Sequence, residues 1–237
     1  MKISTTRRNF VKSSSTLSAG AILASPHILK AVSNDKIIKV GLVGIGGRGS
    51  GAAAQAMNAD PNVALTSIGD LYEDRIKLRS RILKARGRDK YQVTEETTFV
   101  GFDAYKKVID SGIDVVILTS PPAFRPDQLE YAVKKGVHCF FEKPVAVDAP
   151  GVRKVIELAK QAKEKNLNFM SGFCWRHHYP KQEVFTRILN GDLGKVNAMY
   201  STYNGGEVWK KKREEGWGDM EAQTRNWNAH LWLSGDS

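Results

Sequence analysis

The segment from Ile37 to Met57, IIKVGLVGIGGRGSGAAAQAM, constrains the fold more than any other part of the chain. Its first residues, up to Val43, are apolar and rich in β-branched side chains, so they predict a buried strand. The run from Ala52 to Met57 consists of good helix formers and predicts a helix. Because a strand, a glycine-rich turn and a helix follow one another directly, the segment predicts the start of a parallel βαβ unit.

The turn matches the pattern G-x-G-x-x-G, which between a strand and a helix predicts a dinucleotide-binding loop. The first glycine permits the tight turn, the second lets the backbone approach a pyrophosphate, and the third allows the helix to pack closely on the strand. The helix N-terminus offers free N–H groups to the phosphates. We expect all six residues of the pattern to bind the cofactor: Gly44, Ile45, Gly46, Gly47, Arg48 and Gly49.

Asp70 ends the next predicted strand, NVALTSIGD, close to where dinucleotide-binding proteins carry an acidic residue. A carboxylate at this position accepts hydrogen bonds from the ribose hydroxyls of the adenosine and repels a 2′-phosphate, so NAD is favoured over NADP. NADP stays possible, because Arg48 or Arg75 can reach a 2′-phosphate. The alternative role for Asp70 is the N-cap of the helix predicted at LYEDRIKLRSRIL.

Strand and helix signals go on alternating along the chain. IDVVILTS, VHCFFEKP and LNFMSGF predict strands, while DQLEYAVKKG and DAPGVRKVIELAKQAKEKN predict helices, the second with Asp148 as its N-cap. We expect four residues to share the apolar face of that second helix: Val152, Val155, Ile156 and Ala159. This alternation is typical of an α/β fold, interpreted as a Rossmann-like, doubly wound parallel sheet over residues 34–170.

Ligands of such sheets bind beyond the carboxyl ends of the strands. Three segments fall there, namely Thr119–Pro122, Glu142–Pro144 and Trp175–His177. Farther along, KVNAMYSTYNGG at residues 195–206 alternates like an antiparallel strand. We interpret residues 171–237 as the start of an α+β substrate-binding domain with a largely antiparallel sheet.

Residues 1–33 have the layout of an export signal. Thr6 to Lys12, TRRNFVK, resembles the twin-arginine motif, and the uncharged segment LSAGAILAS follows it. We therefore expect export by the twin-arginine machinery to the periplasm. The alternative is a disordered basic tail.

Charge, cysteines and histidines argue against other classes of function. The net charge of +11 is a weak sign of nucleic-acid binding without a binding motif, and residues 1–31 hold five basic residues and no acidic one. Cys139 and Cys174 lie in apolar runs, so we expect both to be buried. No histidine, cysteine or acid cluster has the spacing of a metal site. No uninterrupted apolar run approaches the roughly 18 residues of a membrane span, so we expect no stable membrane insertion.

The glycine loop, Asp70, DVVILTSPP and VHCFFEKPVAVD closely resemble the Gfo/Idh/MocA oxidoreductases. The Glu-Lys-Pro turn is the most specific mark of this family. The resemblance implies that Lys143 is catalytic and hydrogen-bonds the substrate oxygen, with a cis bond before Pro144. It also implies cofactor contacts from a set of residues along the groove: Thr119, Ser120, Pro121, Glu142, Lys143, Trp175 and Arg176.

These roles have plainer alternatives. Lys143 would otherwise be a surface lysine, and Trp175 and Arg176 would pack in the core around a structural ion pair. His177 is either a substrate contact or a partly exposed loop histidine. Many members of the family have a histidine in the segment where this chain has PPAFRPDQ, with Arg125 nearby, so that contact is not carried over.

The family's acid–base pair comes from a segment beyond WLSGDS, the end of this sequence. We therefore expect a truncated gene product, whose full-length form would be a homo-oligomer. The resemblance implies a periplasmic, NAD-dependent oxidoreductase that acts on a sugar or polyol and holds its cofactor tightly. The alternatives are an NAD-dependent glycosidase of the same fold and a non-catalytic sugar- or cofactor-binding protein.

Overall fold

The strands form one parallel sheet at the centre of the fold. The computed structural model describes residues 36–206 and 208–235. The six strands of the sheet are β1 (Ile38–Val43), β2 (Val63–Asp70), β3 (Thr98–Val100), β4 (Val115–Leu118), β5 (His138–Phe141) and β6 (Phe169–Ser171). Their order is β3-β2-β1-β4-β5-β6, and every neighbouring pair is parallel. The order reverses between β1 and β4, which makes that crevice the switch point of a Rossmann sheet.

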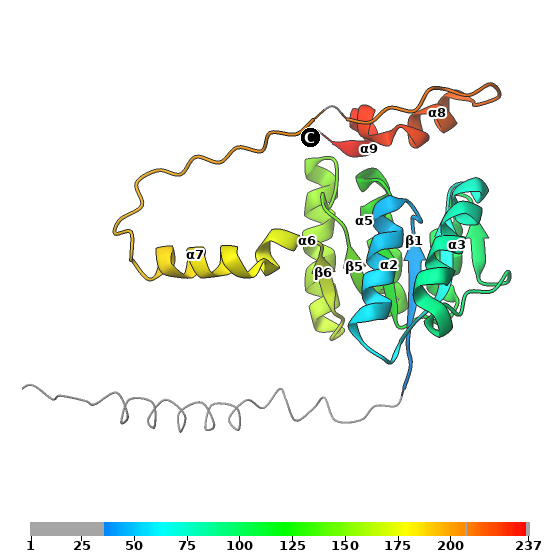
Figure 1. Ribbon diagram of the computed structural model, residues 1–237, viewed down its shortest axis with the longest axis horizontal. Coiled ribbons are helices and arrows are strands. Elements are labelled where there is room, and N and C mark those ends of the chain that lie inside the picture. The colour runs from blue at the N-terminus through cyan, green and yellow to red at the C-terminus, as the bar shows by residue number, and fades with distance from the viewer. Residues whose placement is uncertain (1–35, 207, 236–237) are drawn as a thin grey trace, which may run out of the picture. The chain divides into compact units, whose positions relative to one another are not determined.

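Helices cover both faces of the sheet (Figure 1). One face carries α2 (Gly47–Ala59) and α3 (Glu73–Gly87), and the other carries α4 (Ala104–Asp110), α5 (Arg125–Lys135) and α6 (Ala149–Glu164). The expected α/β fold is confirmed.

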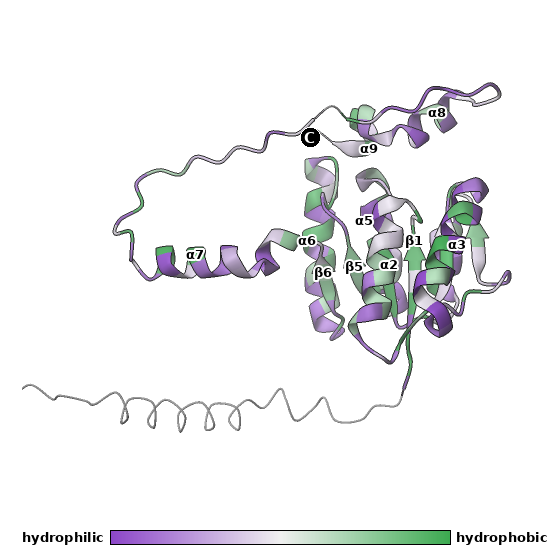
Figure 2. Cartoon of the chain, viewed as in Figure 1, coloured by the Kyte–Doolittle hydropathy of each residue, from purple (hydrophilic) through white to green (hydrophobic). Residues whose placement is uncertain are grey.

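Alternation along the strands builds two hydrophobic cores. In β4, Val116 and Leu118 join the core under α4, α5 and α6, whereas Ile117 joins the core under α2 and α3. Successive strand residues point to opposite faces, so a strand covered on both sides is apolar throughout. Figure 2 shows this pattern, with apolar colour along β1 between helices that carry hydrophilic stretches.

Helix ends follow the sequence signals where capping residues are present. The Asp148 carboxylate accepts a hydrogen bond from the Gly151 N–H at 2.7 Å, which confirms it as the N-cap of α6. Helix α5 ends at Gly136, whose φ of 76° is left-handed. The predicted apolar face of α6 is wrong in part. Val155 is buried, together with Leu158 and Ala162, whereas the other three predicted residues, Val152, Ile156 and Ala159, are exposed.

The remaining elements are short. They are η1 (Arg88–Lys90), η2 (Pro122–Phe124), η3 (Cys174–His177), α7 (Tyr179–Leu189), α8 (Asp219–Arg225), η4 (Trp227–Ala229) and α9 (Leu231–Ser234). No helix among the described residues is long and apolar enough to cross a bilayer.

Two expectations for the region after β6 are wrong. Residues 195–206 do not form a strand, and none of the described residues beyond Ser171 does. A strand needs a hydrogen-bonded neighbour, and alternation alone supplies none. Cys174 is exposed in η3, whereas Cys139 is buried in β5 as expected, and burial raises the pKa of its thiol to about 12.

Candidate functional site

The loop from β1 to α2 is shaped by glycines that admit no side chain. Gly44 has a φ of 88°, and a Cβ there would lie 2.7 Å from the Ser120 nitrogen. A Cβ on Gly49 would lie 1.9 Å from the Gly44 carbonyl oxygen. These contacts bring the helix against the strand and the loop against the end of β4, as the first and third glycines of the pattern predict.

Gly46 serves a different purpose. It is the N-cap of α2, with ordinary extended backbone, and a Cβ there would meet nothing within 4 Å. Its open side faces the cavity described below, at the end of a helix whose first N–H groups have no partner inside the helix. The packing does not require glycine at this position. The open space beside Gly46 instead fits a ligand that approaches the backbone.

Asp70 lies at the end of β2 and fixes the glycine loop. Its carboxylate accepts hydrogen bonds from the Ile45 N–H at 2.8 Å and the Tyr72 N–H at 3.1 Å. Burial raises the pKa of this carboxyl, and the two backbone bonds together with the nearby Arg75 charge oppose the shift. The N-cap alternative is wrong, because α3 begins after Tyr72.

The end of β4 forms the facing wall. The Thr119 hydroxyl donates to the Val43 carbonyl at 3.0 Å, and the Ser120 hydroxyl donates to the side-chain oxygen of Gln128 at 2.5 Å. Thr119 therefore joins β4 to the end of β1 at the switch point.

A cavity of about 170 Å³ opens between these walls. Six of the residues predicted at the cofactor line it: Gly44, Gly46, Asp70, Thr119, Ser120 and Pro121. Ile45 is buried beside it and reaches it only through its bond to Asp70. The structure thus brings together the carboxyl ends of β1, β2 and β4, which is where a doubly wound sheet binds its ligand.

Several lining residues were not predicted. They follow strand ends or belong to the last part of the chain, and they include Leu71, Tyr72, Gly101, Phe102, Tyr105, Phe124, Gln128, Thr224 and Trp227. Position gives a signal for some of them, since the loops after parallel strands meet at one edge. Thr224 and Trp227 have no such signal, because tertiary packing alone brings α8 and η4 to the cavity.

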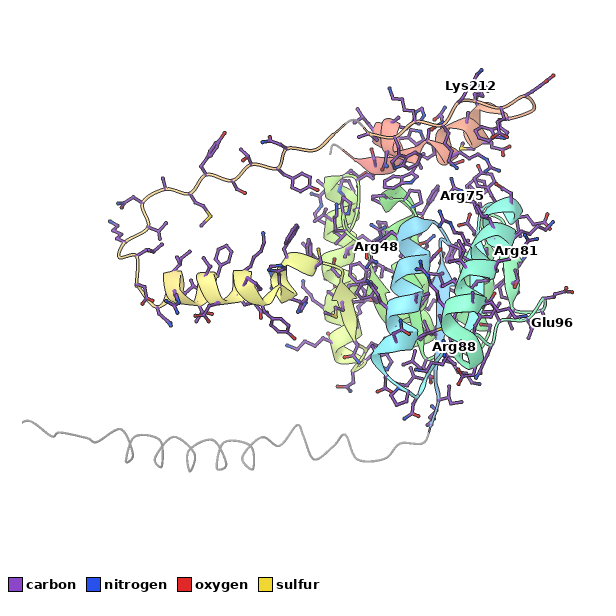
Figure 3. The ribbon with its side chains drawn as sticks, in the orientation of Figure 1. Arg48, Arg75, Arg81, Arg88, Glu96 and Lys212 are labelled. Atoms are coloured by element: carbon purple, nitrogen blue, oxygen red, sulfur yellow. The ribbon has the colours of Figure 1, made fainter. Side chains whose placement is uncertain are left out.

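The Glu-Lys-Pro turn lies beside the glycine loop rather than in the lining of the cavity. Arg48 on α2 (Figure 3) donates from Nε to the Glu142 carboxylate at 2.7 Å, which ties the two loops together. The bond between Lys143 and Pro144 is cis, as the resemblance implied, and the Lys143 side chain is exposed. Exposure leaves this ammonium free to meet a substrate.

Arg125 is buried behind the same turn. Its guanidinium donates to the Ser120 carbonyl at 2.5 Å and to the Pro144 carbonyl, so it joins the end of β4 to the Glu-Lys-Pro turn. Burial lowers the pKa of Arg125 to about 10, and the Glu142 charge opposes that shift.

Three predicted residues lie elsewhere. Trp175, Arg176 and His177 form the exposed η3 and do not line the cavity. The Lys181 ammonium lies 3.9 Å from the centre of the Trp175 ring. The core-packing alternative for Trp175 is wrong, since 56% of the residue is exposed. Among the described residues, no three histidine, cysteine or acidic side chains come together to hold a metal ion.

The site fits a dinucleotide in its chemistry. The open Gly46 backbone at the start of α2 suits a pyrophosphate, the Asp70 carboxylate suits ribose hydroxyls, and aromatic rings border the same cavity.

Comparison with known proteins agrees with this geometry. The model of the Gfo/Idh/MocA oxidoreductase family, described by its NAD-binding Rossmann fold, matches residues 38–173. A dTDP-3,4-didehydro-2,6-dideoxy-alpha-D-glucose 3-reductase of Actinomadura kijaniata is 22% identical over 72% of this chain and 46% of its own length. A glycosyl hydrolase family 109 protein of Shewanella sp. (strain ANA-3) is 22% identical over 81% of this chain and 46% of its own length. The chain therefore spans less than half the length of these curated relatives.

Solved structures give the same fold. The myo-inositol 2-dehydrogenase of Lactobacillus plantarum superposes with a TM-score of 0.56 at 26% identity, over 68% of this chain and 43% of that one. The scyllo-inositol dehydrogenase of Lactobacillus casei, solved with NAD(H) and scyllo-inositol, superposes with a TM-score of 0.55 at 23% identity, over 67% of this chain and 43% of that one. With its glycine loop, the Asp70 carboxylate at the end of β2 and the family's model matched over more than half its length, the chain belongs to the Gfo/Idh/MocA oxidoreductase family and contains its NAD-binding Rossmann fold.

Proposed function

We propose that this chain is the cofactor-binding part of an oxidoreductase that transfers a hydride between a sugar or cyclitol hydroxyl and a tightly held NAD(P). The observation that carries the proposal is the meeting of two loops at one sheet edge. The Arg48–Glu142 ion pair joins the glycine loop to the turn that bears Lys143. A cofactor seated on the first loop would thus have an exposed ammonium beside it.

Lys143 would bind the substrate oxygen and stabilise negative charge that develops there. The nicotinamide supplies the hydride acceptor or donor when the cofactor is bound. Arg125 holds the Pro144 carbonyl and so orients the turn from behind. The proton-transfer partner of the reaction is not assigned to any described residue.

Asp70 favours NAD, because its buried carboxylate would repel a 2′-phosphate. Positive charge nevertheless gathers near Asp70, where Arg75, Lys211 and Arg225 lie close together. The pKa of the Lys211 ammonium is lowered by burial and by the neighbouring Arg75 and Arg225. The proposal therefore names NAD first and keeps NADP as the alternative that the experiment below separates.

Export is part of the proposal. The motif at residues 6–12 lies outside the described residues, so its support is the sequence alone. The twin-arginine route carries folded proteins, which lets a dinucleotide bound in the cytoplasm travel to the periplasm. A cofactor that stays bound would then be oxidised by one substrate and reduced by another.

A second candidate is an NAD-dependent glycosidase of the same fold. It is favoured by the 22% identity to glycosyl hydrolase family 109 proteins. A third reading, a non-catalytic sugar- or cofactor-binding protein, predicts sugar and cofactor binding without turnover. A keto sugar as the final product supports the oxidoreductase, whereas a released sugar supports the glycosidase.

The test starts with the protein purified without added cofactor. Denaturation followed by mass spectrometry identifies any released dinucleotide. Stoichiometric NAD(H) supports the tightly held cofactor and the role of Asp70, whereas NADP(H) overturns that role. Fractionation of expressing cells, with the Arg7→Lys and Arg8→Lys double variant as control, tests the export: periplasmic wild type and retained variant are the expected result.

A further inference from the structure

We infer that the segment from Trp217 to Ser234, the closing segment, forms the outer wall of the adenosine half of the cofactor site. We further infer that Arg225 is the positioning residue that holds this wall closed and so slows cofactor release. The inference rests on dinucleotide binding, but it needs no turnover. It begins from two cavity-lining residues, Thr224 and Trp227, that belong to this segment.

Arg225 is an almost buried cation shared between two elements. Its two terminal nitrogens donate to the two carboxylate oxygens of Asp74, both at 2.9 Å, and its Nε donates to Glu221 at 2.8 Å. The guanidinium lies 3.9 Å from the centre of the Tyr72 ring and 4.7 Å from that of Trp217. A planar fork that is bidentate and stacked in this way fixes orientation as well as charge.

Tyr72 links Arg225 to the carboxylate of Asp70. The Tyr72 hydroxyl hydrogen-bonds the Thr224 hydroxyl, and its backbone N–H donates to Asp70. Tyr72 therefore connects the closing segment directly to the group that is proposed to bind ribose. Because the Arg225 guanidinium lies over the Tyr72 ring, a shift of Arg225 would move that ring.

The other end of the closing segment is anchored independently. Leu233 is completely buried, and a Cβ on Gly235 would lie 3.4 Å from the Val147 backbone. The Trp232 ring packs edge-on against Phe124 at 6.5 Å, and its indole N–H donates to Gln223 at 2.7 Å. The segment is thus fastened near its middle by Arg225 on Asp74 and near its end by the buried Leu233 and by Trp232 on Phe124.

The chemistry of the cavity behind this wall suits a purine nucleoside. Tyr72, Phe102 and Trp227 contribute aromatic rings to the cavity, next to Asp70. Rings of this kind stack on purines, and a cavity closed on its outer side delays escape. Lys143 does not line this cavity, so the closing segment acts on the adenosine end and not on the reacting end.

The test is the Arg225→Met variant, which keeps length and apolar volume and removes the ion pairs. Dissociation of NADH is followed by stopped-flow fluorescence, and binding of reduced nicotinamide mononucleotide, which has no adenosine, is measured in parallel. We expect NADH to dissociate at least tenfold faster from the variant, with unchanged affinity for the mononucleotide. Arg225→Lys keeps one charged donor, so its NADH dissociation rate should lie between those of the wild type and Arg225→Met.

Arg187→Met is the matched control, because Arg187 pairs with the exposed Glu183 on the same helix, α7, outside the closing segment and the cavity. Circular dichroism confirms that each variant is folded, and Thr224→Val, which removes the bond to Tyr72, replaces Arg225→Met if that variant does not fold. Unchanged NADH dissociation, or an equal loss of affinity for NADH and for the mononucleotide, overturns this inference and leaves the proposed cofactor binding intact. A wild-type chain with no NADH affinity overturns it together with the proposed cofactor, while bound NADH without turnover leaves it standing.

Discussion

Substitution by alanine can show which glycines of the β1–α2 loop serve packing and which serve ligand binding. Gly46→Ala places a methyl group in open space with an allowed backbone, so the free energy of unfolding should change by less than about 1 kcal/mol. The same methyl group would occupy the approach to the backbone, so we expect NADH affinity to fall at least tenfold. Thermal unfolding and fluorescence titration measure the two effects.

Gly44→Ala is the matched comparison. It combines a φ of 88° with a Cβ only 2.7 Å from the Ser120 nitrogen, so it should destabilise the fold by about 1 to 3 kcal/mol as well as weaken binding. Equal stability losses in the two variants would show that Gly46 is a packing residue and not a ligand contact.

Asp70 gives a pH dependence whose sign follows from burial. Its pKa is raised, so on acidification it takes up a proton at a higher pH than an ordinary aspartate does. Protonation removes a hydrogen-bond acceptor for Ile45, Tyr72 and the ribose. NAD affinity should therefore decline on acidification, and the decline should begin at a higher pH than an ordinary aspartate would cause. Calorimetric titration of wild type and Asp70→Asn tests this: the variant should bind weakly and with a flatter profile, and a parallel decline in both would exclude Asp70 as the cause.

Local pattern was enough to predict that Gly44, Gly46 and Asp70 come together, and all three line the cavity. They lie at the spacing of the dinucleotide-binding pattern, so the sequence carries this part of the geometry. Tyr72 and Thr224 are 152 positions apart, and only packing brings them together. No spacing rule connects them, which is why the sequence did not predict the adenosine wall.

At the scale of elements, Arg125 joins two loops that the sheet alone would not hold together. Arg125→Met would leave the carbonyls of Ser120 and Pro144 without their donor, and both hydrogen bonds are partly buried. Because water can reach part of this site, we expect a loss of about 1 to 3 kcal/mol in the free energy of unfolding, measured by urea denaturation. The exposed Arg153→Met should stay within about 0.5 kcal/mol of wild type. A similar, small effect in both variants would show that the two loops are held by other contacts.

Helices and strands were predictable where their hydrophobic periodicity agrees with the neighbouring elements that cover them. The strands of the sheet are apolar because helices cover both faces, and that signal is strong in the sequence. Alternation in residues 195–206 was equally clear, yet no neighbouring strand pairs with it. The buried face of α6 depends in the same way on its neighbours, because α5 and β6 decide that Leu158 and Ala162 point inwards and Ile156 does not.

At the scale of the whole molecule, the closing segment is joined to the sheet by a connection without regular structure. The described residues between α7 and α8 form neither helix nor strand, and Lys195 is exposed among them. Limited trypsin digestion should therefore cut within this connection, at Lys195 or in the basic run from residue 210 to residue 213, and either cut leaves the closing segment whole. After the cut, the Arg225–Asp74 pair and the buried Leu233 would hold the fragment in place.

After cleavage, non-covalent contacts decide whether the fragment that carries the closing segment stays bound to the rest of the protein. Burial of Leu233 contributes about 1.5 to 3 kcal/mol, while the ion pair contributes less because Asp74 is partly exposed. The nicked wild-type protein should elute as one species in size-exclusion chromatography and separate into two fragments only on denaturation, and added NAD should strengthen this association because it binds the closed form. Nicked Arg225→Met should lose the fragment sooner, and the undigested wild type and variant are the controls for chain cleavage. Immediate loss of the fragment from the wild-type protein, with or without NAD, would mean that the covalent connection alone keeps the closing segment over the cavity.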